Sequence, residues 1–258
     1  MRSQMFWRGS NTGGASIGLN WIGWLRSRVV SKLNRPLEWA HLDSLLLADE
    51  NDIILSTTLP SHKINSLLTD VAFSATDVHG TATSLESQRT EPSFRFTGVV
   101  PFRQSYKAKI ILDLDGTAYS GRFVALMKSK SAIFKSKLYM ETFDASLIPW
   151  YHYIPVSIRF TEIYNLLGYF FSARNIVKEI VSTGKIPKSF STTMLQAAVR
   201  GVPHEAELKR IAEQGTNWAN ECARKEDMAS YMHLLALEWS RISSDDRESN
   251  GFLLAKEE

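Results

Sequence analysis

The sequence KIILDLDGTAYSGRFVALM, residues 109–127, decides the fold class. Lys109–Leu114 is a largely apolar run of the kind found in a parallel strand that is buried on both faces. Asp115-Gly116 ends this run, and Val124–Met127 continues as a short helix after the turn. Because Ser131–Phe134 supplies another apolar run just downstream, the stretch predicts a strand–helix–strand unit.

The same alternation repeats on both sides of this unit. Upstream, Gln4–Arg8 predicts a strand, followed by a glycine-rich loop and a helix from about Leu19 to Leu33. Downstream, Tyr153–Ile158 predicts a strand and Ile163–Phe171 predicts an apolar helix. We therefore expect an α/β fold in which a Rossmann-like parallel sheet is flanked by helices.

Four other segments carry weaker or purely helical patterns. Leu37–Leu47 favours a helix, whereas Ala75–Thr97 has no clear periodicity and predicts an exposed loop. His204–Arg224 and Lys225–Ile242 are strongly helical, and we expect both helices to pack over the sheet.

Composition limits the class of protein. With 44% hydrophobic residues in 258, residues 1–242 are expected to form one packed domain and residues 243–258 a polar, poorly ordered tail. The formal charge of +3 is spread without basic blocks, which argues against nucleic acid as a partner. No apolar stretch approaches the roughly 20 residues that cross a bilayer, and Met1–Ser10 lacks the apolar run of a secretory signal. The lone cysteine, Cys222, is expected to be a buried core thiol.

A loop rich in glycine and hydroxyl groups follows the first predicted strand. Gly9–Gly14 reads GSNTGG, and glycine lets backbone N–H groups and a helix N-terminus approach an anion. The loop matches neither the dinucleotide fingerprint nor the P-loop pattern. Taken alone, it is therefore more often a plain turn than a phosphate site.

Several short motifs point to one family when they are taken together. They are Phe6–Gly14 (FWRGSNTGG), Asp70–Phe73 (DVAF), Tyr119–Phe123 (YSGRF), Ser131–Ser136 (SAIFKS) and Pro149–Pro155 (PWYHYIP). In this order and spacing they resemble glycosyltransferase family 90, the capsule-associated and protein O-glucosyltransferase-like group. The resemblance spans nearly the whole chain and suggests a fungal-type member.

The resemblance implies the C-terminal, donor-binding domain of a GT-B glycosyltransferase. Its relatives transfer a hexose or pentose from a UDP-sugar to a protein or glycan hydroxyl, without a tightly bound cofactor. It also implies a location in the lumen of the endoplasmic reticulum or Golgi. If the chain is complete as given, we instead expect a cytoplasmic location. In the family the general base lies upstream of the Trp-Arg-Gly-Ser segment, which here begins at Trp7. The acceptor domain and the general base are therefore expected to be absent. The sequence leaves three explanations open, which are a truncated chain, a chain completed by another polypeptide and a donor-binding remnant, and the catalytic residue stays unknown.

Two other functions compete with this interpretation. A catalytically inactive remnant of the donor domain, acting as a nucleotide-binding or scaffold protein, would explain a missing acceptor half. A nicotinamide-dependent Rossmann enzyme fits the composition, but the chain lacks the glycine spacing and the acidic residue about 20 positions further on.

Transfer from a UDP-sugar builds negative charge on the leaving diphosphate, so the site needs fixed positive charge and N–H donors. Arg122 lies in the turn after a buried strand, where open α/β sheets bind ligands, and a guanidinium pairs well with phosphate oxygens. Without the family motif, a surface position would be the commoner explanation for an arginine.

The remaining predicted donor-binding residues lie in the same motifs. By resemblance, the hydroxyl groups of Ser10 and Thr12 bind the diphosphate, the backbone of Gly9, Gly13 and Gly14 assists, and Arg26 or Arg28 adds charge. The full predicted set is Arg8, Gly9, Ser10, Thr12, Gly13, Arg28, Asp115, Ser120, Arg122, Phe123, Lys135 and Glu141.

Three further interpretations concern charged and titratable residues. Lys135 and Glu141 flank a strand end, where they could meet phosphate, sugar or ribose, although a surface ion pair explains them nearly as well. Asp113 and Asp115 share a strand face and could hold Mn²⁺ or Mg²⁺. Because GT-B enzymes generally neutralise phosphate with side chains and helix dipoles, we expect no metal site, and Asp115 is expected to cap the turn that positions Arg122. His152 is expected to be a hydrogen-bonded core residue.

Overall fold

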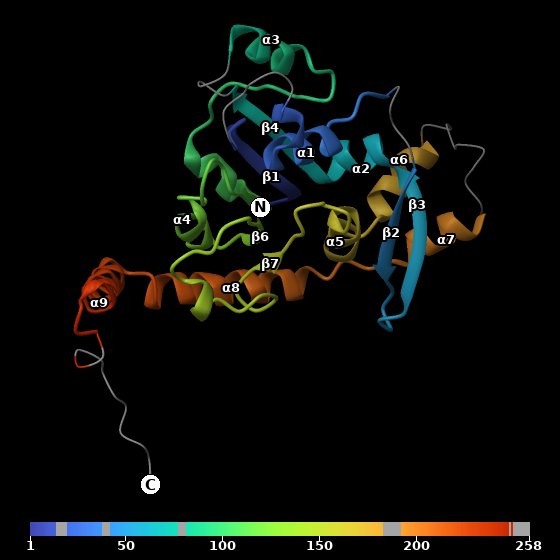
Figure 1. Ribbon diagram of the computed structural model, residues 1–258. Coiled ribbons are helices and arrows are strands. Elements are labelled where there is room, and N and C mark those ends of the chain that lie inside the picture. The colour runs from blue at the N-terminus through green and yellow to red at the C-terminus, as the bar shows by residue number, and fades with distance from the viewer. Residues whose placement is uncertain (14–19, 38–41, 77–80, 183–191, 248, 250–258) are drawn as a thin grey trace.

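A parallel β-sheet forms the centre of the computed structural model, which describes residues 1–13, 20–37, 42–76, 81–182, 192–247 and 249 (Figure 1). Five strands pair in the order β4-β1-β5-β6-β7, and every pairing is parallel. The strands are β1 (Arg2–Ser10), β4 (Thr69–Ala75), β5 (Ala108–Leu114), β6 (Ala132–Ser136) and β7 (Ile154–Pro155). The expected α/β fold with a Rossmann-like sheet is confirmed.

Helices surround the sheet, and a separate antiparallel hairpin lies at its side (Figure 1). The hairpin consists of β2 (Leu42–Ala48) and β3 (Ile54–Pro60). The described α-helices are α1 (Leu25–Leu33), α2 (Ser61–Leu68), α3 (Ala82–Thr90), α4 (Phe123–Met127), α5 (Ile163–Phe171), α6 (Arg174–Ser182), α7 (Thr192–Arg200), α8 (Glu205–Glu221) and α9 (Lys225–Ser243). Short 3₁₀ turns occur at Asn20–Gly23, Phe102–Lys107 and Asp144–Ser146.

The two faces of the sheet are buried under different helices. Trp7, Leu112 and Phe134 belong to the larger core cluster, which includes buried residues of α1, α2 and α5. Ile111 and Ile133 point to the other face and belong to a second cluster with residues of α4 and α8. Burial on both faces explains why β5 is apolar at almost every position.

The strand order changes direction between β1 and β5. From β1 the chain reaches β4 on one side, and it later returns past β1 to form β5 on the other. Ligands of open parallel sheets bind at such a switch point, outside the carboxyl ends of the strands. At this edge, β1 ends in Gly9-Ser10 and β5 runs into Asp113–Asp115.

The helix predicted over Leu37–Leu47 is wrong in its second half. Leu42–Ala48 forms strand β2, which pairs with β3. Leu45 and Leu47 are buried beside α5, while Leu46 is exposed, so the side chains alternate as in a strand. Packing of this alternating face outweighed the helical preference of leucine.

Two more elements differ from the sequence interpretation. The predicted loop Ala75–Thr97 contains helix α3, whose N-cap Thr81 accepts a hydrogen bond from the Ser84 N–H group. This polar helix is anchored by Gln88, whose side chain accepts from Asn11 at 3.0 Å. The predicted strand Tyr153–Ile158 shortens to the two residues of β7.

The last two helices behave differently from one another. Helix α8 buries Leu208, Ile211 and Trp218, as expected for a helix that packs over the sheet. Helix α9 buries none of its residues, so its predicted packing is wrong, and Figure 1 shows it beyond the end of α8 at the edge of the molecule. Cys222, at the end of α8, is exposed and is not the buried thiol expected from sequence. No helix in the described part of the chain is both long and apolar enough to traverse a bilayer.

Candidate functional site

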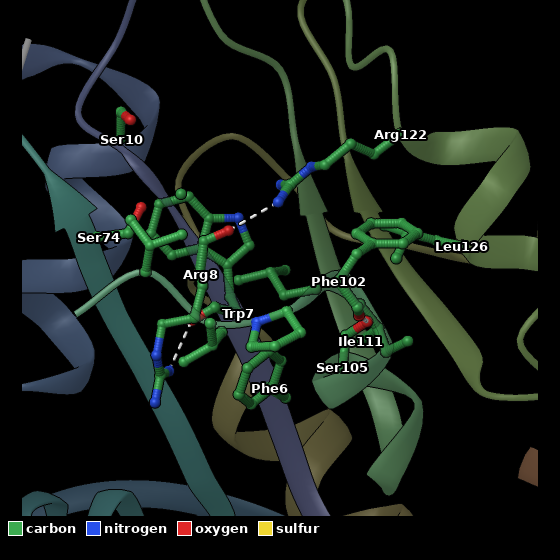
Figure 2. A pocket seen from close by; sticks show the side chains of 15 residues that line it. Phe6, Trp7, Arg8, Ser10, Ser74, Phe102, Ser105, Ile111, Arg122 and Leu126 are labelled. Atoms are coloured by element: carbon green, nitrogen blue, oxygen red, sulfur yellow. Dashed lines mark hydrogen bonds between the residues drawn. The ribbon is translucent and has the colours of Figure 1, made fainter. Parts of the chain in front are cut away.

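A cavity of ≈ 200 Å³ opens beside the carboxyl end of β1, on the sheet face that carries α4 (Figure 2). Val99–Phe102 gives it an apolar wall, and Ile111 of β5 contributes to its base. Ser10, Ser74 and Arg122 supply polar groups. The cavity therefore combines an apolar surface with hydroxyl groups and one cation at the switch point of the sheet.

Arg122 reaches from the N-cap position of α4 across to β1. Its Nη1 donates a hydrogen bond to the carbonyl oxygen of Arg8 at 2.7 Å, drawn as a dashed line in Figure 2. Its Nη2 has no hydrogen-bond partner among the described residues and lies 4.0 Å from Asp113 Oδ1. Arg122 therefore lies beside the Gly9-Ser10 turn with its side chain 34% exposed, while Nη2 itself is buried on the Asp113 side.

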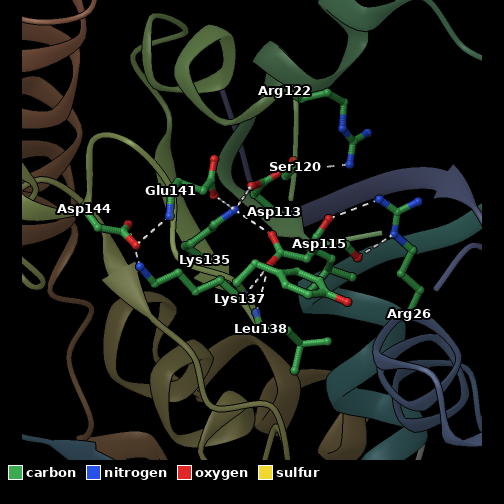
Figure 3. A network of polar contacts seen from close by, with 12 residues as sticks. Arg26, Asp113, Asp115, Ser120, Arg122, Lys135, Lys137, Leu138, Glu141 and Asp144 are labelled. Atoms are coloured by element: carbon green, nitrogen blue, oxygen red, sulfur yellow. Dashed lines mark hydrogen bonds and ion pairs between the residues drawn. The ribbon is translucent and has the colours of Figure 1, made fainter. Parts of the chain in front are cut away.

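Arg26 of α1 ties the ends of β1 and β5 together (Figure 3). Its guanidinium donates to three main-chain carbonyl groups and one hydroxyl at 2.7–3.1 Å, those of Ser10, Leu114, Asp115 and Thr12. The glycine turn and the carboxyl end of β5 are thus held at a fixed spacing by one side chain.

The positive charge of Arg26 is close to that of Arg122. Burial, and then the charge of Arg122, lower the pKa of Arg26 to about 10. Arg26 is therefore cationic at neutral pH, and it lies close to the Arg122 guanidinium at this edge of the sheet. Asp113 and Asp115 act in the opposite direction and raise the pKa of Arg26, but by less.

Arg28 does not join this edge. It lines a separate groove with Trp21 and Glu91, and its Nε has no hydrogen-bond partner among the described residues. The cation that α1 brings to the glycine turn is Arg26, so the predicted role of Arg28 is corrected in favour of the neighbour that sequence analysis named beside it.

Lys135 projects from β6 into a closed cluster of three carboxylates (Figure 3). Its Nζ lies 2.9 Å from Asp113 Oδ2, 3.0 Å from Asp115 Oδ1 and 2.9 Å from Glu141 Oε1, and its side chain is 1% exposed. Burial alone would lower the pKa of Lys135, but Asp113 and the other two carboxylates outweigh burial and raise it. A direct contact of Lys135 with phosphate or sugar is not supported by this position, because its three donors face carboxylates.

The two carboxylates of the metal hypothesis, Asp113 and Asp115, both belong to this cluster. Asp113 and Asp115 do share a face, as the strand period requires, but both bind Lys135. Across the described ranges, no group of three His, Cys, Asp or Glu side chains is arranged to hold a metal ion. Burial raises the pKa of Glu141, which stays partly exposed at the edge of the cluster.

The YSGRF turn is anchored from beneath by β5. Ser120 is buried and its Oγ donates to Asp113 Oδ1 at 2.6 Å. Phe123 is also buried, with the Lys135 ammonium 4.7 Å from its ring centroid. Neither residue offers its side chain to the cavity, so both are placed to hold Arg122 in position rather than to contact a ligand.

Asp115 holds a different loop from the one expected. Its Oδ2 accepts hydrogen bonds from the main-chain N–H groups of Leu138 and Tyr139, which follow β6. The residue that fixes the turn before Arg122 is Asp113, acting through Ser120. The prediction that Asp115 caps this turn is therefore wrong.

The glycine turn keeps only part of its predicted set at the cavity. The guanidinium of Arg8 pairs with Asp70 at 2.6 Å and points away from Ser10 and Arg122 in Figure 2, so Arg8 contributes its carbonyl group. A Cβ on Gly9 would lie 2.8 Å from the Trp7 ring, and therefore only glycine fits there. Gly13 has a φ of 152°, a conformation that favours glycine, whereas Gly14 lies outside the described residues.

His152 is a core residue, as predicted. Its Nδ1 accepts a hydrogen bond from the Ile148 N–H group at 3.0 Å, and burial lowers its pKa. Its carbonyl oxygen packs so tightly on α8 that a Cβ on Gly215 would lie 2.3 Å away. This histidine is far better placed for packing than for acid–base chemistry.

Comparison with known proteins agrees with the geometry. The family model described as Glycosyl transferase family 90 matches residues 68–199. The matched segment contains β4, β5 and β6, together with the YSGRF turn. No curated protein matches the chain at a significant level.

Proposed function

The chain belongs to glycosyltransferase family 90, and from this premise we propose that it binds a UDP-sugar at the carboxyl ends of β1 and β5 for transfer to a protein or glycan hydroxyl. The observation that carries the proposal is the position of Arg122. Its guanidinium lies beside the glycine turn, Nη1 is fixed on the Arg8 carbonyl, and the side chain remains 34% exposed.

The charged and N–H groups at this edge suit a nucleoside diphosphate. Arg122 and Arg26 supply two cations, and the Ser10 hydroxyl and the backbone of Gly9 lie beside them. Guanidinium groups and N–H donors are the groups that bind phosphate oxygens best. The apolar wall Val99–Phe102 offers a surface for the flat base.

The same geometry would assist departure of the diphosphate. As the bond between the anomeric carbon and the diphosphate oxygen breaks, negative charge grows on the leaving group. Arg122 would stabilise this charge without first being ordered, because the Arg8 carbonyl already holds it in place. Ser120 and Lys135 would act through Asp113 as positioning residues. A lumenal location follows from the family by analogy.

Calorimetric titration with UDP tests the proposal. Arg122→Ala is expected to weaken UDP binding at least tenfold, about 1.4 kcal/mol. Arg210→Ala is the matched control, because Arg210 lies on the exposed surface of α8 with only Gln214 and Glu207 as partners. We expect the control to bind UDP as the wild type does.

Two results would contradict the proposal. Folded wild-type protein without affinity for UDP would remove the nucleotide site, and equal affinities of Arg122→Ala and wild type would remove Arg122 from it. UDP binding without transfer or sugar-nucleotide hydrolysis would instead favour the second candidate, an inactive nucleotide-binding protein.

A further inference from the structure

Two exposed tyrosines stand on neighbouring loops at the carboxyl edge of the sheet. Tyr119 lies in the turn between β5 and α4 and is 62% exposed, and Tyr139 lies in the loop after β6 and is 45% exposed. Leu138 and Met140 beside them are also exposed. Large apolar side chains gathered beside a polar site are a feature of ligand-binding surfaces.

These rings stand on a rigid support. The Tyr139 hydroxyl donates to the Thr117 carbonyl oxygen at 3.3 Å, which joins the loop after β6 to the turn that carries Tyr119. The main-chain N–H groups of Leu138 and Tyr139 donate to Asp115, whose other oxygen is bound by Lys135. Both loops are therefore fixed to the buried charge cluster.

The tyrosine loops also touch the glycine turn. A Cβ on Gly116 would lie 2.9 Å from Thr12 Oγ1 and 3.0 Å from Arg26 Nη2, so the chain after β5 passes directly over the groups proposed to face the diphosphate. Tyr119 follows three residues later in the same turn. Arg122, which is proposed to face the diphosphate, follows Tyr119 by three residues in that turn.

We infer that Tyr119 and Tyr139 form the subsite for the sugar of the donor, with the Tyr119 ring packed against the C–H face of a hexose or pentose. The inference rests on the proposed function. A sugar ring has an apolar face and a polar edge, and a tyrosine ring covers the first while remaining compatible with water. Because the Tyr139 hydroxyl is already bonded to Thr117, Tyr139 mainly fixes the spacing between the loops, whereas Tyr119 has its whole ring free for contact.

The test compares UDP with sugar nucleotides in calorimetric titrations of the wild type, Tyr119→Ala and Tyr119→Phe. The probes are UDP, UDP-glucose, UDP-xylose and UDP-galactose. Tyr119→Ala is expected to weaken the tightest-binding sugar nucleotide at least fivefold and to leave UDP within twofold. Tyr119→Phe is expected to keep wild-type affinity for both, because the ring remains.

A control variant and the contradicting outcomes distinguish failure of the sugar subsite from failure of the proposed function. Tyr231→Ala removes a similarly exposed tyrosine from α9 and should change neither affinity. Equal effects of Tyr119→Ala on UDP and on the sugar nucleotide, or no effect on either, would overturn the sugar subsite while UDP binding by the wild type sustains the proposed function. Absence of UDP binding by the wild type would overturn both. An effect confined to acceptor binding would also overturn the sugar subsite.

Discussion

Lys135 and Arg122 stand at the same edge of the sheet, but the fold encloses only the first of these two cations. Lys135 is 1% exposed and faces Asp113, Asp115 and Glu141, whereas Arg122 is 34% exposed and bonds to a main-chain carbonyl. The lysine is closed off inside the protein by three carboxylates, whereas the arginine shares one of them, Asp113, and keeps part of its side chain at the surface. A cation enclosed by carboxylates and a cation left partly at the surface are thus distinguished by their partners and not by their place in the sequence.

The largest expected effect comes from removing the buried cation, Lys135. Lys135→Met should lower the free energy of unfolding by about 3–5 kcal/mol, because it leaves three buried or half-buried carboxylates without their cation. Urea unfolding followed by circular dichroism measures the loss. A loss below about 1 kcal/mol would show that the cluster tolerates an uncompensated charge.

Lys137→Met is the control for this measurement. Lys137 follows two residues later and pairs with Asp144, but its side chain is 31% exposed. A pair screened by water in this way contributes about 1 kcal/mol at most. Equal losses in the two variants would mean that burial of the Lys135 cluster has no special importance.

Ser120→Ala should have the next largest effect, because it removes the link between the two cations. The hydroxyl donates to the buried carboxylate of Asp113 at 2.6 Å, and a hydrogen bond to a charged group contributes about 1.5–3 kcal/mol. Ser146→Ala removes an exposed hydroxyl that donates to the Phe143 carbonyl and should cost about 0.5 kcal/mol or less. Indistinguishable unfolding curves for the two variants would contradict a role of Ser120 in the turn.

A pH series should test whether Lys135 carries its charge inside the cluster. The pKa of Lys135 is raised, so its contribution to stability is present below the unfolded-state value of about 10.4 and is lost as pH rises further. The difference in unfolding free energy between wild type and Lys135→Met should therefore shrink by about 1.4 kcal/mol per pH unit above that value. Urea unfolding of both proteins between pH 8 and pH 11 measures it, and a constant difference would count against a charged lysine in the cluster.

The smallest effect on stability is expected for Arg122→Ala. The variant loses one hydrogen bond to a carbonyl group, and its side chain is partly exposed, so the free energy of unfolding should fall by about 1 kcal/mol or less. Combined with the loss of UDP affinity, this would separate binding from folding at one edge of the sheet. A large loss of stability would show that Arg122, like Lys135, mainly supports the fold.

The central strand–turn–helix–strand unit was predictable because its signal is local. β5 and β6 are buried on both faces, and a short run of apolar residues is enough to show this. β2 was not predictable in the same way, since a leucine-rich run fits a helix until α5 shows which face is buried. Helix α9 was predicted from the spacing of its apolar residues, but that spacing does not show whether another element packs against them.

The candidate site shows the same limit at the level of single residues. Sequence placed Arg122 and the Gly9-Ser10 turn at the carboxyl edge, and the structure brings them together. It could not choose between Arg26 and Arg28, because positions two apart on a helix point about 200° away from each other and the orientation of α1 is set by its packing. The pairing of Lys135 with Asp113 depends on strand register, which follows from the three-dimensional structure.

Arg26 has a further consequence for how a ligand would be received. Its bonds join the carbonyl groups of Ser10, Leu114 and Asp115, so the two strand ends cannot spread or close independently. If an anion bound at this edge, the two strand ends would lose little conformational freedom. The smaller entropy cost would strengthen binding. The framework is thus held by one guanidinium that donates to three carbonyl groups and to the Thr12 hydroxyl, so toward a bound anion Arg26 would contribute mainly its charge.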